Sequence, residues 1–266
     1  MAVIVFTSAT GAPGVTTASL GMALTWPRHA LLADCDREPA QAVQAGYLRG
    51  MDHGGRGLMT LAHLHREGNA LAPELWRQTL PLAEGGDLQR RVLPGFTSPG
   101  AARLFEHEWP ALGEACESLD GQGVDVLVDA GRLSTSGLPL GLLSAADVVL
   151  LTVRSSLRSL AGARLHLYTL TDQLAALPRQ TQLGLGIVGP GRPYSAAEIA
   201  AQFSLPCWAE VPWDAKAAEV LSDGTPEPRR FFEGSFMGRL RADGKAVSDR
   251  LARARQVTAV VTGGPR

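Results

Sequence analysis

Short runs of apolar, often β-branched residues alternate along the chain with longer stretches in which apolar residues recur at helical spacing. The runs that we predict to be strands are residues 3–6, 30–33, 88–93, 124–129, 147–153, 183–188 and 207–211. The stretches with helical spacing are residues 16–26, 101–119, 155–174 and 195–203. Because parallel strands covered by helices on both faces are almost wholly apolar, the pattern predicts an α/β fold. We expect a doubly wound, mainly parallel sheet with helices on both faces.

The pattern changes after a turn-rich stretch at residues 223–228. We therefore expect one domain over residues 1–228, a basic amphipathic helical extension over 229–256 and a flexible tail over 257–266. Between Arg229 and Arg255 the extension holds eight Arg and Lys residues and three Asp and Glu residues, a local charge of +5, beside an apolar side. Such a helix packs on the core with its basic side in solvent, or docks on a membrane surface or on DNA.

Composition is that of an ordinary globular protein. The 266 residues are 45% hydrophobic and 19% charged, and the net charge of −1 gives no overall field that selects nucleic acid or membranes. The three cysteines are isolated and odd in number, which fits a reducing compartment. The sequence shows neither the basic start of a secretory signal nor an apolar run of about 18 residues that would span a membrane. We therefore expect a cytoplasmic protein.

A glycine-containing loop lies between the first predicted strand and the first predicted helix. Residues 10–17 read Thr-Gly-Ala-Pro-Gly-Val-Thr-Thr. The two glycines permit close backbone approach, and the amides at the start of the following helix attract anions. This predicts a phosphate-binding loop, in which Thr16 also carries a hydroxyl for Mg²⁺. The alternative is a strand-to-helix turn without a ligand. The predicted phosphate-binding residues are Gly11, Ala12, Pro13, Gly14, Val15, Thr16 and Thr17.

Three carboxylates follow predicted strands. Asp34 and Asp36 come after the second strand, and Asp129 ends the fourth. Ligands of open α/β sheets lie outside the carboxyl ends of the strands, so we expect these side chains to lie close to the loop. We predict Thr16, Asp34 and Asp129 to hold a metal ion, and Asp36 to position an attacking water as the catalytic residue. The alternative is that they are solvated or cap helices.

Taken in order, these segments resemble the ParA/MinD group of deviant Walker ATPases, a P-loop family of the SIMIBI class. The resemblance covers roughly residues 2–228. It implies a P-loop NTPase fold, ATP or ADP with Mg²⁺ as cofactors, and contacts to the base from Pro212 and Asp214. The similar segments are the phosphate loop at 10–17, an acidic motif at 31–36, a Walker B strand at 124–129, the segment at 153–158, and a late loop at 211–214 and 224–226.

Three positions depart from the family pattern. Thr10 replaces the signature lysine that crosses the family's dimer, Val15 replaces the Walker lysine, and Gly189 stands where the family has a base-reading asparagine. The first lysine of the chain is Lys216. Because one oxyanion-type contact is worth about 3–4 kcal/mol in catalysis, we expect weak nucleotide binding and slow or absent hydrolysis. The arginines considered as replacements are Arg132, Arg154 and Arg192.

The resemblance implies a cellular positioning or assembly factor, of the kind that acts in chromosome or plasmid partition or in septum, pilus or secretion localisation. It also implies a homodimer, a protein partner at an assembly site, and peripheral contact with a membrane surface or non-specific DNA through the basic extension. Two alternatives stay open: a slow but active ATPase in which an arginine replaces the Walker lysine, and a scaffold that binds no nucleotide. A role like that of the TadZ/CpaE proteins is a further variant of the first hypothesis.

Overall fold

The computed structural model describes residues 1–9, 14–83, 85–98 and 100–262, the last five of them through the backbone alone. Thr10, Gly11, Ala12 and Pro13 of the predicted phosphate loop lie outside the described residues, as do residues 263–266 of the predicted tail. The loop is described again from Gly14, where the first helix is about to begin.

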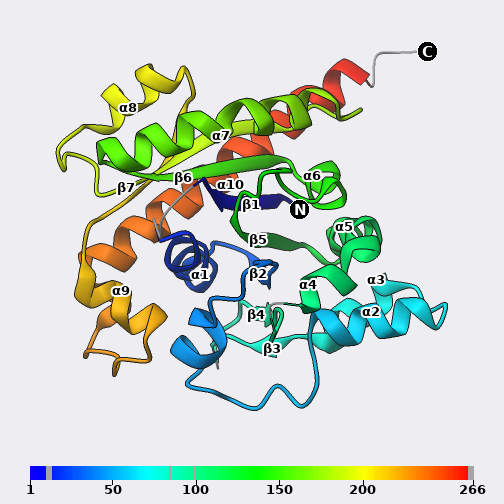
Figure 1. Ribbon diagram of the computed structural model, residues 1–266. Helices are drawn as coiled ribbons and strands as arrows, with labels where there is room; N and C mark the ends of the chain where they lie inside the picture. Colours follow the sequence, from blue (N-terminus) through cyan, green and yellow to red (C-terminus); the bar gives the residue numbers. More distant parts are fainter. Residues whose placement is uncertain (10–13, 84, 99, 263–266) are drawn as a thin grey trace.

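An eight-stranded sheet forms the centre of the molecule (Figure 1). Its strand order is β3-β4-β2-β5-β1-β6-β7-β8, and every neighbouring pair is parallel except β3 and β4. The predicted doubly wound, mainly parallel sheet is confirmed. The strands are β1 (Val3–Ser8), β2 (His29–Asp34), β3 (Leu80–Pro81), β4 (Arg90–Leu93), β5 (Val124–Arg132), β6 (Val148–Arg154), β7 (Gln182–Val188) and β8 (Cys207–Val211).

Helices cover both faces of the sheet and create two hydrophobic clusters. The face that we name the α1 side carries α1 (Val15–Thr25), a π-helical turn at Ala42–Tyr47, α9 (Ala215–Ser222) and α10 (Ser235–Thr262). The opposite face carries α2 (Leu58–Arg66), α3 (Leu71–Leu75), α4 (Ala101–Leu104), α5 (Trp109–Ser118), α6 (Leu140–Ala145), α7 (Leu157–Ala175) and α8 (Ala196–Phe203). Short 3₁₀ turns lie at Trp76–Gln78, Glu106–Glu108, Leu119–Gln122 and Phe231–Glu233.

The stretch at 101–119, which the apolar spacing predicts as one helix, is divided in the structure. Helix α4 ends at Leu104, a 3₁₀ turn follows at Glu106–Glu108, and α5 begins at Trp109. Pro110 lies in the first turn of α5. Proline lacks the amide hydrogen that a continuous helix would need there, but it fits the first turn of a new one.

The C-terminal helix α10 packs on α1 and β8 and belongs to the core of the α1 side. Met237 and Leu240 are fully buried. Gly21 of α1 allows α10 to pack closely against it, because a Cβ at this position would lie 2.4 Å from Leu240 Cδ1. The segment that the sequence sets apart as an extension therefore completes the hydrophobic core, and the helix continues to Thr262, into the predicted tail.

The charged residues of α10 are also engaged with the body of the protein. Arg239 Nε donates to Asp243 Oδ1 at 3.0 Å, and Asp243 Oδ2 accepts from the Glu210 amide of β8 at 2.9 Å. Arg250 lies over the Trp208 ring, and Arg255 bonds Asp147 at 2.6 Å. No helix within the described residues is both long and apolar enough to cross a membrane.

Candidate functional site

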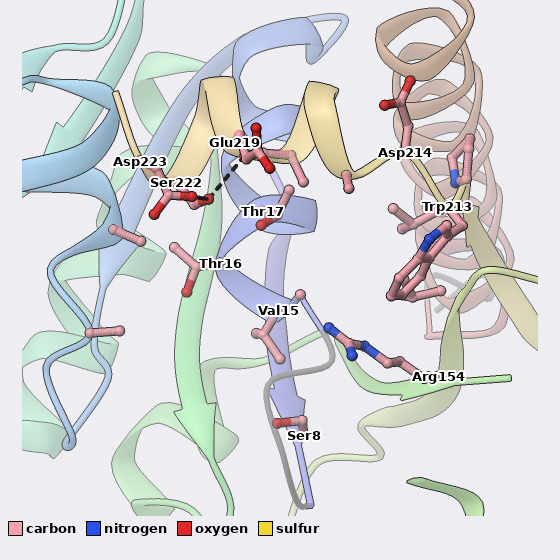
Figure 2. Close-up of a pocket in the computed structure, with 18 of the residues that line it drawn as sticks. Ser8, Val15, Thr16, Thr17, Arg154, Trp213, Asp214, Glu219, Ser222 and Asp223 are labelled. Atoms are coloured by element: carbon pink, nitrogen blue, oxygen red, sulfur yellow. Dashed lines mark hydrogen bonds between the residues drawn. The ribbon is translucent and has the colours of Figure 1, made fainter. Parts of the chain in front are cut away.

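A pocket of about 420 Å³ opens at the carboxyl ends of the central strands, on the α1 side of the sheet (Figure 2). Strand β1 lies between β5 and β6, so the chain leaves it toward one half of the sheet and later returns to build the other. Such a switch point is where open α/β sheets bind ligands. The pocket is lined from several segments, among them Ser8 of β1, Gly14 to Thr17, Asp36, Arg132 of β5, Arg154 of β6, Pro212 to Asp214, and residues of α9.

The start of α1 forms one wall of the pocket. Gly14 has φ +92° and ψ +33°, a left-handed conformation that favours glycine, and its carbonyl accepts from the Ala18 amide at 2.9 Å. The free amides of the first turn give this end of the helix a partial positive charge. Val15, Thr16 and Thr17 line the pocket directly, so the described part of the predicted phosphate loop faces a cavity.

Asp34 and Asp129 lie side by side on neighbouring parallel strands, because they are register partners of β2 and β5. Asp129 is buried, and its carboxylate accepts from the Gly131 amide at 3.0 Å and from the Ser19 hydroxyl at 3.5 Å. The Thr16 hydroxyl donates to it as well. The pKa of Asp129 is raised by burial, and the donors of Thr16, Gly131 and Ser19 oppose that rise.

Of the three predicted carboxylates, Asp36 is the one that lines the pocket. The Asp36 carboxylate is fixed by a hydrogen bond, since its Oδ1 accepts from the Glu38 amide at 2.9 Å. It also packs tightly against Gly131, where a Cβ would lie 2.0 Å from the same oxygen. Burial raises the pKa of Asp36 to about 6, and the charge of Asp129 adds to the rise. Burial and the two neighbouring carboxylates raise the pKa of Asp34 to about 8. The site thus gathers carboxyl groups whose pKa values are raised by burial and by one another, an arrangement found at functional sites.

Asp34 and Asp129 are neighbours on β2 and β5, and the Thr16 hydroxyl acts on Asp129; that the three hold a metal ion stays a prediction. Within the described chain, no group of three His, Cys, Asp or Glu side chains is arranged to hold a metal ion. The available donors are hydroxyl and carboxylate oxygens, which suit Mg²⁺ when water and phosphate oxygens supply the remaining ligands. Asp129 with Thr16 would hold such an ion at the phosphate side of the pocket.

The segment from Pro212 to Asp214 forms the opposite wall. Asp214 caps α9, since its Oδ1 accepts from the Ala217 amide at 3.0 Å. Trp213 contributes a ring that is 46% exposed, and a Cβ at Gly189 would lie 3.4 Å from Trp213 Cβ. Trp213 therefore occupies the space beside the position where the resembled family has an asparagine. The sequence motif contained Trp213, but only the position of its ring in the pocket identifies it as a site residue.

Two arginines line the pocket. Arg132 follows Gly131 at the end of β5, and its guanidinium lies 3.7 Å from a carboxylate oxygen of Glu38. Arg154 ends β6, and its guanidinium carbon lies 4.9 Å from the centre of the Trp213 ring. Arg192 also approaches that ring, at 5.9 Å, but does not line the pocket. The structure thus places Arg132 and Arg154 at the cavity.

Comparison with solved structures identifies the fold. A ParA family ATPase from Chlorobium tepidum TLS aligns with a TM-score of 0.68 at 14% identity, over 92% of this chain and 97% of that one. The MinC:MinD cell division protein complex of Aquifex aeolicus aligns with a TM-score of 0.66 at 14% identity, over 94% and 96%. The septum site-determining protein MinD of Pyrococcus horikoshii OT3, complexed with Mg-ADP, aligns with a TM-score of 0.64 at 18% identity, over 94% and 97%.

These similarities extend over nearly the whole of each chain, so they apply to the complete architecture. At identities of 14–18% they concern the fold. No family model and no curated protein sequence matches the chain.

Proposed function

The chain has the fold of the ParA and MinD ATPases, and from that premise we propose that it is a ParA/MinD-like positioning or assembly factor with a degenerate ATP site. In this proposal it binds ATP or ADP with Mg²⁺ weakly and hydrolyses ATP slowly or not at all. The observation that carries the proposal is the pocket, which joins the start of α1, Asp36 and the segment from Pro212 to Asp214 in one cavity. The MinD relative with bound Mg-ADP supports the choice of ligand.

The weakness of binding follows from the side chain at Val15. Its isopropyl group is 6% exposed and lines the pocket without offering a charge. The backbone amides of α1 remain as anion donors, and such amides bind phosphate without a lysine at reduced strength. Losing one preorganised cationic or oxyanion-type contact lowers turnover by about 10²–10³. A site of this kind favours occupancy by nucleotide over rapid hydrolysis.

The proposed mode of action is a nucleotide-dependent change in assembly. We propose a homodimer in the cytoplasm that recruits a protein partner to an assembly site. A relative of this fold is found in complex with a partner, as in the MinC:MinD structure. The basic side of α10 is the proposed contact with a membrane surface or with non-specific DNA. Its apolar side is buried on the core, so the contact would be electrostatic rather than by insertion.

A second candidate function is a slow but active ATPase. The observation that favours it is Arg154, a guanidinium at the pocket that carries a positive charge where the loop provides none. In that reading Asp36 orients the attacking water, and its raised pKa makes the carboxylate a stronger base than a solvated one.

Thermal unfolding with and without Mg-ATP tests both candidates. Ligand at about 100 times its Kd stabilises a protein by about 2.7 kcal/mol. A rise in Tm without phosphate release supports the non-hydrolysing factor. A rise with phosphate release that Asp36→Ala abolishes supports the slow ATPase. An unchanged Tm at millimolar Mg-ATP contradicts both and leaves a nucleotide-free scaffold.

A further inference from the structure

Arg154 has an unusual setting for an arginine of this protein. Its Nε is buried and has no hydrogen-bond partner among the described residues, and its guanidinium makes no salt bridge there. By contrast, Arg239 bonds Asp243 at 3.0 Å, and Arg179 bonds Asp147. An unpaired buried donor is costly, so a guanidinium left in this state favours an incoming anion.

Trp213 fixes the direction of that guanidinium. The Arg154 guanidinium lies over the indole ring at 4.9 Å from its centre, within the range of a cation–π contact. Figure 2 shows the Arg154 side chain reaching from the strand side of the pocket toward Val15, where α1 begins. The arginine is therefore preorganised to face the same volume as the first amides of α1.

A second unpartnered group lies in the same cavity. Ser8 is 1% exposed, lines the pocket, and its Oγ has no partner among the described residues. Ser8 of β1 is the register partner of Thr152 of β6, two residues before Arg154. Because side chains alternate along a strand, Ser8 and Arg154 project from the same face of the sheet. A buried hydroxyl and a guanidinium thus converge with the amides of α1.

Carboxyl groups and the Arg154 guanidinium lie on opposite sides of β1 at the site. On one side of β1, Asp36 lines the pocket and Asp34 and Asp129 end β2 and β5; on the other side, Arg154 ends β6. The other carboxylates of the lining, Asp214, Glu219 and Asp223, lie on α9 or beside its ends. A ligand that satisfies both sides carries a divalent cation near the carboxylates and anionic oxygens near the arginine. A Mg²⁺-bound di- or triphosphate has that form.

We propose that Arg154, held by Trp213 and assisted by the Ser8 hydroxyl, binds the phosphate oxygens of the nucleotide and supplies from β6 the positive charge that position 15 lacks. The inference rests on the proposed nucleotide site and names the residue that makes the site anion-specific. Arginine suits this task, because its planar fork forms two parallel hydrogen bonds to a phosphate.

Calorimetric titration of the full chain with Mg-ATP and with adenosine tests the proposal. The variant is Arg154→Met, and the matched control is Arg192→Met, which removes a guanidinium from the same ring outside the pocket. We expect Arg154→Met to weaken Mg-ATP binding about 10- to 100-fold, the range for hydrogen bonds to charged groups, and to leave adenosine binding unchanged. Arg192→Met should retain the wild-type affinity for Mg-ATP, and Arg154→Lys should recover part of the loss.

The outcomes separate the two proposals. If the wild-type chain binds no Mg-ATP, both the nucleotide site and the role of Arg154 are refuted. If the wild type binds Mg-ATP and Arg154→Met binds it equally, the role of Arg154 alone is refuted. Should Arg154→Met fail to fold, Ser8→Ala provides the second variant, with an expected loss of about 3- to 10-fold for Mg-ATP and none for adenosine. Equal affinity of wild type and Ser8→Ala would then overturn the proposal.

Discussion

Asp34 and Asp129 are register partners at the carboxyl ends of β2 and β5, so two carboxylates project from one face of the sheet beside each other. Asp129 is bonded by Thr16, Ser19 and Gly131, whereas Asp34 accepts only a long bond, at 3.4 Å, from the Asp36 amide among the described residues. Burial and the two neighbouring carboxylates raise the pKa of Asp34 to about 8.

The first prediction concerns pH. Because the pKa of Asp34 is raised from 3.8 to about 8 on folding, the folded state binds more protons than the unfolded state between these two values. The contribution of Asp34 to stability is therefore greatest below pH 4 and declines as the pH rises toward 8. We expect Asp34→Asn to be more stable than the wild type at pH 8 by at least about 1 kcal/mol, with a gap that narrows at pH 5. Urea unfolding at both pH values measures it, and a gap independent of pH would contradict it.

The second prediction concerns Mg²⁺. Asp129 is bonded to the Thr16 hydroxyl, and this pair is the proposed holder of the ion. Asp129→Asn keeps the shape of the side chain but removes its charge, so the part of the ATP-induced rise in Tm that depends on Mg²⁺ should be lost. The wild type in the presence of EDTA is the matched reference. A Mg²⁺-dependent rise of normal size in Asp129→Asn would exclude Asp129 as a metal-holding residue.

The third prediction concerns position 15. Val15 lines the pocket at the first turn of α1, so a lysine there would place an ammonium near the bound phosphates. We expect Val15→Lys to raise the affinity for Mg-ATP by about 10-fold or more, the value of a charge-assisted hydrogen bond. Val15→Met, of similar length and without charge, should leave the affinity unchanged. Calorimetric titration of both variants decides whether the missing charge limits binding.

Val15→Lys also tests the inferred role of Arg154, because both side chains line the same pocket. Two cations in one site repel each other when no ligand is bound. We expect the gain from Val15→Lys to be larger in an Arg154→Met background than in the wild type. Strictly additive effects on affinity would indicate that the two positions do not share a phosphate.

The fourth prediction concerns α10. Leu240 is fully buried against α1, and replacing a buried leucine with alanine costs about 2–5 kcal/mol. Leu240→Ala should therefore lower the free energy of unfolding by that amount, while Val257→Ala, at a side chain 65% exposed, should change it by less than about 0.5 kcal/mol. A chain ending at Pro228 should fail to fold, as circular dichroism and thermal unfolding would show. A soluble, cooperatively unfolding truncation would contradict the place of α10 in the core.

The fifth prediction separates the proposed surfaces. Arg229 and Arg253 are exposed residues of the basic segment. If this segment contacts anionic surfaces, Arg229→Glu together with Arg253→Glu should reduce co-sedimentation with anionic liposomes or retention on DNA, and salt should weaken the wild-type interaction. Unchanged binding to both would leave α10 with a packing role alone. If only liposome binding or only DNA binding is lost, that interaction identifies the surface that the basic segment contacts.

The sequence alone predicts the alternation of strands and helices, because β-branched apolar runs and helical spacing are local properties of the chain. It also placed Thr16, Asp36 and Asp129 near strand and helix ends, where a parallel sheet gathers ligand-binding side chains. It could not divide residues 101–119 correctly, because the apolar spacing continues across a break that Pro110 permits. Nor could it show that α10 belongs to the core, since a basic amphipathic pattern has the same form on a core as on a membrane.

The groups that share the pocket are brought together by the three-dimensional fold. Ser8, Arg154 and Trp213 come from three segments far apart in the chain, and no local pattern relates them. Their proximity follows from the strand order, which puts β6 beside β1 and carries the segment after β8 to the same edge. The sequence identified three arginines that could replace a lost lysine. The register of β1 with β6 and the position of the Trp213 ring identify Arg154 as the candidate. An arginine binds a phosphate only if the fold holds its guanidinium within reach of that phosphate.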